Sequence, residues 1–257
     1  MNDVTAPGGR KIRASVCMAT YRGAAFVEEQ IASILAELGA NDELVIVDDA
    51  SPDQTADIVD KIEDGRIRLI RAASNRGYVR TFEEAVRISR GEYIFLSDQD
   101  DIWIPGRLEL MLAGLTKSQV VASNFDMLGG GPRPWIPRLR SSDSRRHLAN
   151  LAGILVGYRA YYGCGMAFRR EAAQLFTPIP PYVRESHDLW LAICGNIAGS
   201  MTHLDQSTIY RRLHEENQTP AGWRSLPKIL SARVMLLRLI VEAFRRSRRA
   251  SKPAVLR

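Results

Sequence analysis

The sequence predicts an α/β fold built on a mainly parallel central sheet that is flanked by helices. The main observation is that short, continuous apolar runs alternate along the chain with segments in which apolar residues recur at helical spacing. A second observation is that acidic residues follow two of these runs directly, and folds of this class bind ligands at the carboxyl ends of their strands. The third is the composition of the 257-residue chain, 46% hydrophobic and 25% charged, which is typical of a globular protein with a full core.

The individual elements can be predicted in order, after a flexible leader at residues 1–11 that has no periodicity. Strands are expected at apolar runs that are too short for a helix, namely residues 14–19, 44–47, 67–70, 93–96 and 120–123. Helices are expected where the apolar residues recur at helical spacing, namely residues 27–38, 53–62, 79–89 and from Pro105 onward. We therefore predict one α/β domain over residues 12–222 and a basic helical extension over residues 223–257.

The composition excludes several classes of protein. The three cysteines, Cys17, Cys164 and Cys194, are odd in number and lack the spacing of a zinc site or a disulfide framework. The start of the chain contains no apolar run, and no segment approaches the roughly 18–20 uncharged apolar residues that span a bilayer. We expect a cytoplasmic chain that is neither exported nor integral to a membrane.

The net charge of +6 is concentrated at the C-terminal end. From Arg224 onward ten basic residues stand against one acidic residue, so residues 1–223 carry a net charge of −3. Apolar residues recur at helical spacing between Leu226 and Phe244, with basic residues on the other side. Such a basic amphipathic helix packs on the preceding domain, lies on an anionic membrane surface, or does both. Nucleic acid is not an expected partner, because no aromatic side chains stand between the arginines.

Two acidic motifs follow predicted strands. Asp48 and Asp49 end the second strand, where aspartates are also common as turn and capping residues. The motif DQDD at residues 98–101 follows the strand at residues 93–96. Three carboxylates in four residues repel one another unless a cation lies among them. Mn²⁺ or Mg²⁺ would accept these oxygens together with substrate phosphates, for which the sequence offers no glycine-rich phosphate loop.

Six segments in this order resemble the family-2 glycosyltransferases and, among them, the bacterial rhamnosyltransferase-like enzymes. They are residues 16–22 (VCMATYR), 46–51 (IVDDAS), 75–82 (NRGYVRTF), 91–103 (GEYIFLSDQDDIW), 163–168 (GCGMAF) and 185–190 (ESHDLW). The resemblance implies the GT-A type fold of nucleotide-diphospho-sugar transferases. It also implies that a sugar, expected to be rhamnose, moves with inversion from a dTDP- or UDP-linked donor to a hydroxyl of a cell-surface glycan or glycolipid.

The resemblance assigns a nucleotide site to the first four segments. Its expected residues are Ala19, Tyr21, Arg22, Asp49, Arg80, Asp98 and Gln99. A tyrosine ring can stack on a pyrimidine, and a carboxylate can accept hydrogen bonds from the base or the ribose. Asp98 and Asp100 are the expected metal ligands. The alternatives are that Tyr21 covers the edge of the sheet and that Arg80 is a solvated helix residue.

The resemblance makes Asp188 the expected catalytic base, which would take a proton from the acceptor hydroxyl. The alternative is a capping role, because Asp188 precedes an apolar run at the expected start of a helix. If Asp188 only caps the helix, Glu185 and His187 are the next candidates for the base. The acceptor is expected to contact Gly163, Cys164, Gly165, Trp103, Trp190 and Glu185.

Residues 211–217 (RRLHEEN) are similar to a closing segment of the family, although the tyrosine stands one place early at Tyr210. The similarity implies that His214 binds the metal. It also implies contacts to the leaving diphosphate, whose developing charge requires donors and cations, from Arg211, Arg212 and Asn217. An ordinary charged surface loop is the alternative.

Two other functions remain open at this stage. A metal-dependent phosphohydrolase or nucleotidyltransferase acting on nucleotide-sugars could use residues 98–101, but it would need neither Asp188 nor an acceptor segment. A non-catalytic peripheral membrane adaptor would need the helical extension alone. If the chain is the transferase that it resembles, we expect it to work at the inner face of the membrane.

Overall fold

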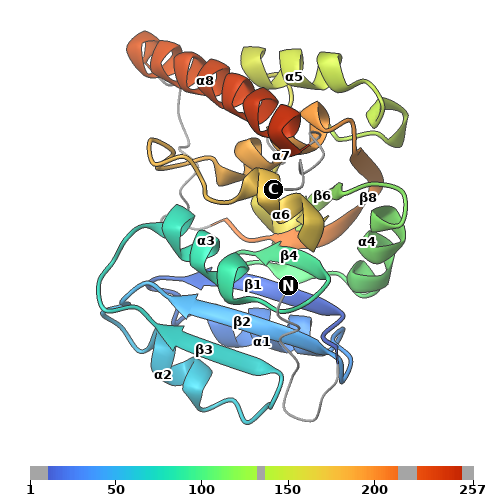
Figure 1. The fold of residues 1–257 in the computed structure, drawn as a ribbon. Coiled ribbons are helices and arrows are strands. Elements are labelled where there is room, and N and C mark those ends of the chain that lie inside the picture. The colour runs from blue at the N-terminus through green and yellow to red at the C-terminus, as the bar shows by residue number, and fades with distance from the viewer. Residues whose placement is uncertain (1–10, 132–136, 214–224, 251–257) are drawn as a thin grey trace, which may run out of the picture.

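The molecule is described by a computed structural model that covers residues 11–131, 137–213 and 225–250 (Figure 1). Within these residues, one eight-stranded mixed sheet runs through the centre in the order β3-β2-β1-β4-β7-β6-β8-β5. The strands are β1 (Ala14–Thr20), β2 (Asp42–Asp48), β3 (Ile67–Arg71), β4 (Tyr93–Ser97), β5 (Ile102–Trp103), β6 (Val120–Met127), β7 (Met166–Arg169) and β8 (Met201–Arg211).

One half of the sheet is parallel, as the sequence predicts. The strands β3, β2, β1 and β4 all run in the same direction. In the other half, β6 and β8 are parallel, whereas β7 runs antiparallel to its neighbours β4 and β6, and β5 runs antiparallel to β8. The two reversed strands have four and two residues, too few to form a periodic pattern in the sequence.

Helices cover both faces of the sheet, because alternate residues of a strand point to opposite faces. In β1, Cys17 joins the cluster under α3 and α7, whereas Val16 and Met18 join the cluster under α1 and α4. The longer helices of the domain are α1 (Val27–Leu35), α2 (Thr55–Asp60), α3 (Tyr78–Ile88), α4 (Arg107–Leu115), α5 (His147–Val156) and α7 (His187–Ile197), and α6 (Ala173–Phe176) is a single turn.

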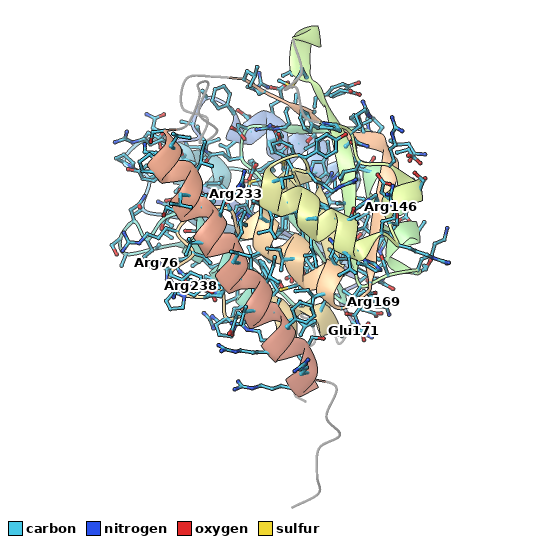
Figure 2. The ribbon with its side chains drawn as sticks, turned by 90° about the horizontal axis from the view of Figure 1, so that it is seen from above. Arg76, Arg146, Arg169, Glu171, Arg233 and Arg238 are labelled. Atoms are coloured by element: carbon cyan, nitrogen blue, oxygen red, sulfur yellow. The ribbon has the colours of Figure 1, made fainter. Side chains whose placement is uncertain are left out.

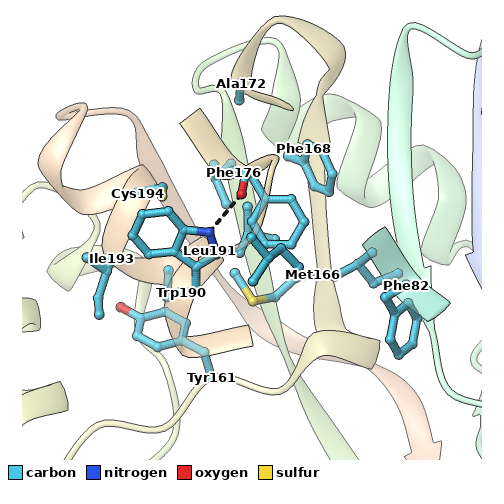
Figure 3. Packing of buried hydrophobic residues seen from close by; sticks show 14 of the residues in the cluster. Phe82, Tyr161, Met166, Phe168, Ala172, Phe176, Trp190, Leu191, Ile193 and Cys194 are labelled. Atoms are coloured by element: carbon cyan, nitrogen blue, oxygen red, sulfur yellow. Dashed lines mark hydrogen bonds between the residues drawn. The ribbon is translucent and has the colours of Figure 1, made fainter. Parts of the chain in front are cut away.

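The core under α7 is aromatic (Figure 3). Trp190 is fully buried, and its Nε1 donates a hydrogen bond of 2.7 Å to the carbonyl of Phe176. The rings of Phe168 and Phe176 pack with their centroids 5.5 Å apart. Full burial of one such apolar side chain contributes about 1.5–3 kcal/mol, so this cluster fixes α7, and with it the residues at the start of α7.

The carboxyl ends of β1, β2 and β4 meet at one edge of the sheet, because the three strands are parallel and in register. Thr20 pairs with Asp48, and Met18 pairs with Ser97. The residues that directly follow these three strands therefore gather at this edge, as the sequence predicts for Asp49 and residues 98–101.

The C-terminal extension forms the long helix α8 (Leu226–Ala250), which packs against α7, α5 and α6 (Figure 1). Leu236, Leu239 and Ala243 are buried in this contact. The packed arrangement, one of the two that the sequence left open, is therefore present. Among the described residues, no helix combines the length and the apolarity needed to cross a membrane.

Candidate active site

A cavity of about 640 Å³ lies between the carboxyl ends of β1, β2 and β4 and the start of α7. Many of the predicted site residues line it, and these are Ala19, Tyr21, Arg22, Asp49, Asp98, Gln99, Asp100, Gly163, Glu185, Asp188 and Arg211. The fold thus brings the expected nucleotide side and the expected acceptor side to one cavity. His214 and Asn217 lie outside the described residues.

The side chain of Gln99 holds the turn that follows β1. Its Oε1 accepts a hydrogen bond of 2.9 Å from the backbone N–H of Tyr21, and its Nε2 donates one of 2.9 Å to the carbonyl of Tyr21. A Cβ at Gly23 would lie 2.3 Å from Oε1 of Gln99, so glycine leaves the room that this amide needs. The guanidinium of Arg22 lies over the ring of Tyr21, 5.3 Å from its centroid. Gln99 therefore positions Tyr21 in the cavity wall.

Replacing Gln99 with alanine should loosen this turn and weaken nucleotide binding. Two ordinary hydrogen bonds are lost, so the free energy of unfolding should fall by about 1–3 kcal/mol. Thermal unfolding and calorimetric titration with nucleotide test the two effects. Gln99→Glu turns a carboxylate toward the Tyr21 carbonyl, so it should lower the stability and the nucleotide affinity at least as much as Gln99→Ala does. Wild-type nucleotide affinity in both variants would show that the hydrogen bonds of Gln99 do not position Tyr21 for nucleotide binding.

The carboxylate of Asp49 organises the loop that precedes α3. Asp49 is almost fully buried; its Oδ1 accepts a hydrogen bond of 2.9 Å from Arg76 N–H, and its Oδ2 accepts one of 2.8 Å from Gly77 N–H. The neighbouring Asp48 instead accepts hydrogen bonds from Ser51. The turn-forming role that the sequence left open therefore applies to Asp48. Asp49 lines the cavity, and a carboxylate oxygen that already accepts one bond can accept another.

Carboxylates converge at the end of β4. Among the described residues, possible ligand atoms of Asp98, Asp101 and Cys164 all lie within 4.8 Å of one another. Burial, followed by the charge of the neighbouring carboxylates, raises the pKa of both Asp98 and Asp101. Burial also raises the pKa of the Cys164 thiol well above its usual range, so this side chain stays protonated.

The two carboxylates of this group, rather than the protonated thiol of Cys164, fit a hard divalent cation. Oδ2 of Asp101 is buried and has no hydrogen-bond partner among the described residues, and a cation would satisfy it. The sequence named Asp98 and Asp100 as ligands. Asp100 lines the same cavity but is not one of the three residues whose ligand atoms lie together. Asp98, Asp100 and Asp101 thus bring three carboxylates to one cavity, and we call their side chains the acidic cluster.

The two arginines at the end of β8 lie differently. Arg211 lines the cavity, and its guanidinium lies over the rings of Phe125 and Tyr162, 5.0 and 4.6 Å from their centroids. Its charge also acts on the acidic cluster, where it opposes the rise in pKa. Arg212 instead forms an ion pair of 2.5 Å with Glu29 and does not line the cavity. Of the two, Arg211 is the one placed to meet an anionic ligand.

Asp188 is the second residue of α7, and it lines the same cavity as the acidic cluster. The N-cap position is Ser186, whose φ is 66°, so Asp188 is not the N-cap residue, although its carboxylate meets an N–H of the first turn of α7. Oδ1 of Asp188 accepts a hydrogen bond of 2.7 Å from Leu189 N–H. Its enclosed position, together with the charge of Asp98, raises the pKa of Asp188 to about 7. A carboxylate with such a pKa suits general-base catalysis near neutral pH.

The sequence analysis did not assign the aromatic side chains around Asp188 to the site. Tyr78, Phe82 and Tyr162 line the cavity, and so does His187, which the sequence suggested only as a substitute base. His187 is almost fully buried and stacks on Phe82 with ring centroids 4.5 Å apart. Neither of its ring nitrogens has a hydrogen-bond partner within the described parts of the chain. Burial lowers the pKa of His187 to about 4, so the ring is neutral and offers one donor and one acceptor.

Four residues expected on the acceptor side lie behind the cavity wall. Trp190 is a core residue with no exposed surface, and Trp103 is buried beneath Arg107, whose guanidinium lies 4.5 Å from its ring centroid. Cys164 and Gly165 are buried as well, and only their neighbour Gly163 lines the cavity. The two tryptophans support the fold and cannot touch an acceptor in this conformation.

Arg80, expected in the nucleotide site, is also placed elsewhere. Its guanidinium donates hydrogen bonds to three backbone carbonyls in the segment before α7, those of Ile179, Pro180 and Val183. It also forms an ion pair of 2.6 Å with Glu83. Arg80 is therefore neither a solvated residue nor a part of the cavity wall, and it ties α3 to the segment that leads to Asp188.

Solved structures with a similar fold come from TarS of S. aureus. The structure of TarS residues 1–349 in complex with UDP-GlcNAc has a TM-score of 0.67 at 17% identity and covers 91% of this chain and 72% of that one. The complex of the same fragment with UDP has a TM-score of 0.66 at 19% identity and covers 90% of this chain and 65% of that one. This likeness shows the fold, and it is the GT-A fold.

Named relatives resemble the chain in sequence. An uncharacterized glycosyltransferase of Nostoc sp., alr2836, is 26% identical over 80% of this chain and 66% of its own length. TuaG of Bacillus subtilis, named as a glycosyltransferase of teichuronic acid biosynthesis, is 32% identical over 70% of this chain and 71% of its own. WfgD of Escherichia coli, named as a UDP-Glc:α-D-GlcNAc-diphosphoundecaprenol β-1,3-glucosyltransferase, is 31% identical over 44% of this chain and 46% of its own. The chain thus spans less than two thirds of the length of alr2836 and WfgD.

The fold, with an acidic cluster at the carboxyl ends of its parallel strands, is of the GT-A class. The chain belongs to glycosyl transferase family 2, whose family model matches residues 15–176.

Proposed function

We propose that this chain is an inverting, metal-dependent glycosyltransferase, which moves a sugar from a nucleotide-diphosphate donor to a hydroxyl group of a glycan or lipid-linked acceptor. The observation that carries the proposal is that the acidic cluster, after β4, and Asp188, at the start of α7, line one cavity. Phosphate chemistry alone would need the acidic cluster but no further carboxylate at the start of α7. Attack by an acceptor hydroxyl needs both, because charge must be stabilised on the leaving group while a proton is removed from the nucleophile.

The donor would bind along the strand ends. Tyr21 offers an exposed ring face for the base, and Asp49 offers carboxylate oxygens to the donors of the base or ribose. Arg211 offers a guanidinium to the diphosphate, since it lies beside the acidic cluster.

Mn²⁺ or Mg²⁺ would be held by Asp98 and Asp100, with Oδ2 of Asp101 as a further oxygen. When bound, the cation supplies positive charge that stabilises the leaving diphosphate. Without it, the same carboxylates would repel the donor, which is the physical reason to expect metal dependence. The ligand role of His214 stays a prediction from the sequence.

Asp188 would take the proton from the acceptor hydroxyl as that oxygen attacks the sugar. Gly163 and Glu185 line the same part of the cavity and would face the acceptor. Attack from the side opposite to the leaving diphosphate inverts the anomeric carbon. The proposed base and the proposed leaving-group site come from different elements, Asp188 from α7 and the acidic cluster from the turn after β4.

The donor is proposed to be UDP- or dTDP-linked, with rhamnose as the sugar expected from the sequence. WfgD is named for a UDP-glucose donor and an undecaprenol-linked acceptor, and TuaG for teichuronic acid biosynthesis, which supports a donor of this kind and an acceptor on the route to a cell-surface polysaccharide. A lipid-linked acceptor would be presented at a membrane. We place this chain on the cytoplasmic side, at an anionic surface that α8 would contact.

A panel of nucleotide-sugars tests the proposal. UDP-glucose, UDP-GlcNAc and dTDP-rhamnose are each added with Mn²⁺, and thermal stabilisation is measured; a ligand at about 100 times its Kd adds about 2.7 kcal/mol of stability. The donor that stabilises is then incubated with candidate acceptors and its products are analysed. Transfer of the sugar supports the proposal, whereas release of free sugar or sugar phosphate in every case would indicate the phosphohydrolase alternative.

Replacing His187 with phenylalanine should raise the KM for one of the sugar substrates while thermal stability stays close to that of the wild type. The ring would keep its stacking on Phe82 but lose a donor and an acceptor that have no partner inside the described protein. The loss of a hydrogen bond to a substrate hydroxyl costs about 0.5–1.5 kcal/mol, or roughly 2- to 13-fold in KM. Steady-state kinetics with donor and acceptor varied separately would show which substrate His187 contacts. An unchanged KM for both would assign His187 to packing alone.

A further inference from the structure

Exposed apolar side chains are concentrated on one side of the molecule. Of the twelve large hydrophobic side chains that are exposed among the described residues, nine lie on α8, on α5 or in the turn after α5. Proteins rarely leave so many in one region unless the region meets a partner or a membrane.

Helix α8 has two apolar faces. One face holds Leu236, Leu239 and Ala243 and is buried against the domain. The other face is exposed, and its residues recur every three or four positions, as one side of a helix requires; they are Leu226, Leu230, Val234, Leu237, Val241 and Phe244. Packing on the domain therefore uses only half of the apolar surface of α8.

Helix α5 continues this surface. It packs on α7 beside α8, and Figures 1 and 2 show the two helices next to each other on the same side of the molecule. Leu148 is 78% exposed and Val156 is 71% exposed, and Ala152 between them is exposed too, so these three positions form one outward stripe. Leu151 and Ile154 lie on the opposite side of α5 and are buried. Because α5 and α8 both pack on α7, their exposed stripes both face away from it.

The charges around these stripes are almost all positive. Helix α8 carries seven basic residues and Glu242 as its one acidic residue, and Glu242 forms an ion pair of 2.9 Å with Arg246. Helix α5 contains no acidic residue and follows Arg145 and Arg146, of which Arg146 forms an ion pair of 3.2 Å with Asp143. Arg245, Arg248 and Arg249 are exposed and form no ion pair with any described residue. Figure 2 shows Arg233 and Arg238 along α8 as well.

We propose that α5 and α8 together form a docking face for a bilayer that contains anionic lipids. The exposed stripes would enter the boundary between headgroups and acyl chains, and the arginines would contact the lipid phosphates. The positive charge of the two helices favours an anionic membrane over a second copy of the chain. A symmetric contact between two copies would bring two sets of arginines together. We call the exposed side chains of the two helices the two-helix face.

The two-helix face is rigidly connected to the cavity through α7. Asp188 stands in the first turn of α7, while the body of the same helix carries α5 and α8. The guanidinium of Arg238 on α8 also lies 4.2 Å from the ring centroid of Tyr182, in the segment that leads to α7. Docking would thus hold the cavity in one orientation relative to the membrane. The inference rests on the proposed function in one respect, namely that docking would bring the cavity within reach of a lipid-linked acceptor. Membrane binding itself needs neither the sugar donor nor catalysis.

Vesicle flotation without nucleotide tests the docking face. The full chain should float with vesicles of phosphatidylcholine containing about one third phosphatidylglycerol, and binding should fall steeply between about 0.05 M and about 0.5 M salt. Pure phosphatidylcholine vesicles should bind far less. Two pairs of substitutions, Leu148→Asp with Val156→Asp on α5 and Val234→Asp with Val241→Asp on α8, should each reduce binding roughly tenfold or more.

Matched controls separate the face from general electrostatics. Ala36→Asp with Ala40→Asp adds the same two charges at exposed positions elsewhere, and should leave binding within about twofold of the wild type. Exchanging Arg245, Arg248 and Arg249 for glutamine should weaken binding, whereas the same change at the exposed Lys61, Arg87 and Lys117 should not. Should an aspartate pair prevent folding, Leu148→Ser with Val156→Ser takes its place.

Three results would overturn the inference. The first is that the variant with Leu148→Asp and Val156→Asp binds vesicles as strongly as the wild type. The second is that the wild type binds neutral and anionic vesicles equally. The third is a dimer in sedimentation velocity that forms without lipid and is lost in both aspartate pairs, which would assign the face to a second copy of the chain. If the protein floats with vesicles but transfers no sugar, the docking face stands and the proposed function is contradicted. If it transfers sugar to a soluble acceptor but never floats, the proposed function stands and the docking face is contradicted.

Discussion

Asp188→Asn should abolish sugar transfer while leaving donor affinity and thermal stability nearly unchanged. Asparagine keeps an oxygen that can accept the hydrogen bond from Leu189 N–H, and the N-cap of α7 is Ser186 rather than Asp188, so the helix should lose little stability. What asparagine cannot do is accept a proton. General-base catalysis is typically worth about 10²–10⁴ in rate, or roughly 3–5 kcal/mol of barrier, and that factor should disappear from kcat.

Transfer rate, donor affinity and melting temperature should be measured on one preparation of each variant. Glu185→Gln is the matched control, because Glu185 is a second carboxylate in the wall of the same cavity and lies three residues away. It should lose far less activity than Asp188→Asn. If Asp188→Asn transfers sugar within a few-fold of the wild type and Glu185→Gln does not, the base is Glu185 and the role assigned to Asp188 is wrong.

The pH dependence of transfer adds an independent check on Asp188. Its pKa is raised to about 7, so below that pH the carboxyl group is protonated and cannot take the acceptor proton. We expect kcat/KM to rise with pH up to about 7 and then to level off. His187 should not contribute to this rise, because its pKa is lowered to about 4 and its ring is neutral throughout the range. Asp98 and Asp101, whose pKa values are raised to about 6 and about 7, titrate in the same range, so the profile is compared with that of Asp188→Asn. A flat profile between about pH 5 and pH 8 would speak against a base with the pKa of Asp188.

Local patterns in the sequence were sufficient to predict the parallel half of the sheet and the gathering of Asp49 and residues 98–101 at one edge of it. Asp49 and Asp98 follow continuous apolar runs, and parallel strands in register bring such positions together whatever lies elsewhere in the chain. The register then places both side chains in one cavity. The choice between Asp100 and Asp101 as the neighbour of Asp98 depends on the conformation of the turn after β4, which the sequence does not specify.

Helical geometry would have corrected one prediction. Residues two positions apart on an α-helix point in directions about 200° apart, so Trp190 must face the core once Asp188 faces the cavity. Arg80 could not have been placed in this way, because its partners are the carbonyls of Ile179, Pro180 and Val183, about a hundred residues further along the chain. Its contacts depend on the tertiary structure alone.

Removing divalent cations should weaken donor binding by at least roughly tenfold, and Asp100→Ala should do the same in the presence of Mn²⁺. The physical reason is charge, because without a cation the negative diphosphate must approach three carboxyl groups. The raised pKa values of Asp98 and Asp101 protonate a fraction of these two groups, but they supply no positive charge. The measurement is calorimetric titration with the nucleotide diphosphate, in Mn²⁺ and in EDTA. Glu63→Ala removes an exposed carboxylate far along the sequence from the acidic cluster and should leave the affinity unchanged in both conditions.

The same titration decides which carboxylates hold the ion. The sequence names Asp98 with Asp100, whereas the structure brings ligand atoms of Asp98 and Asp101 together and leaves Oδ2 of Asp101 without a hydrogen-bond partner among the described residues. If Asp101→Ala loses the Mn²⁺-dependent part of the affinity and Asp100→Ala keeps it, the ion is bound by Asp98 and Asp101. If the nucleotide binds equally well in EDTA and in Mn²⁺, neither pair holds a metal that the donor needs. Arg211 would then be the cation that compensates the diphosphate, and Arg211→Gln should cost more affinity than any change in the acidic cluster.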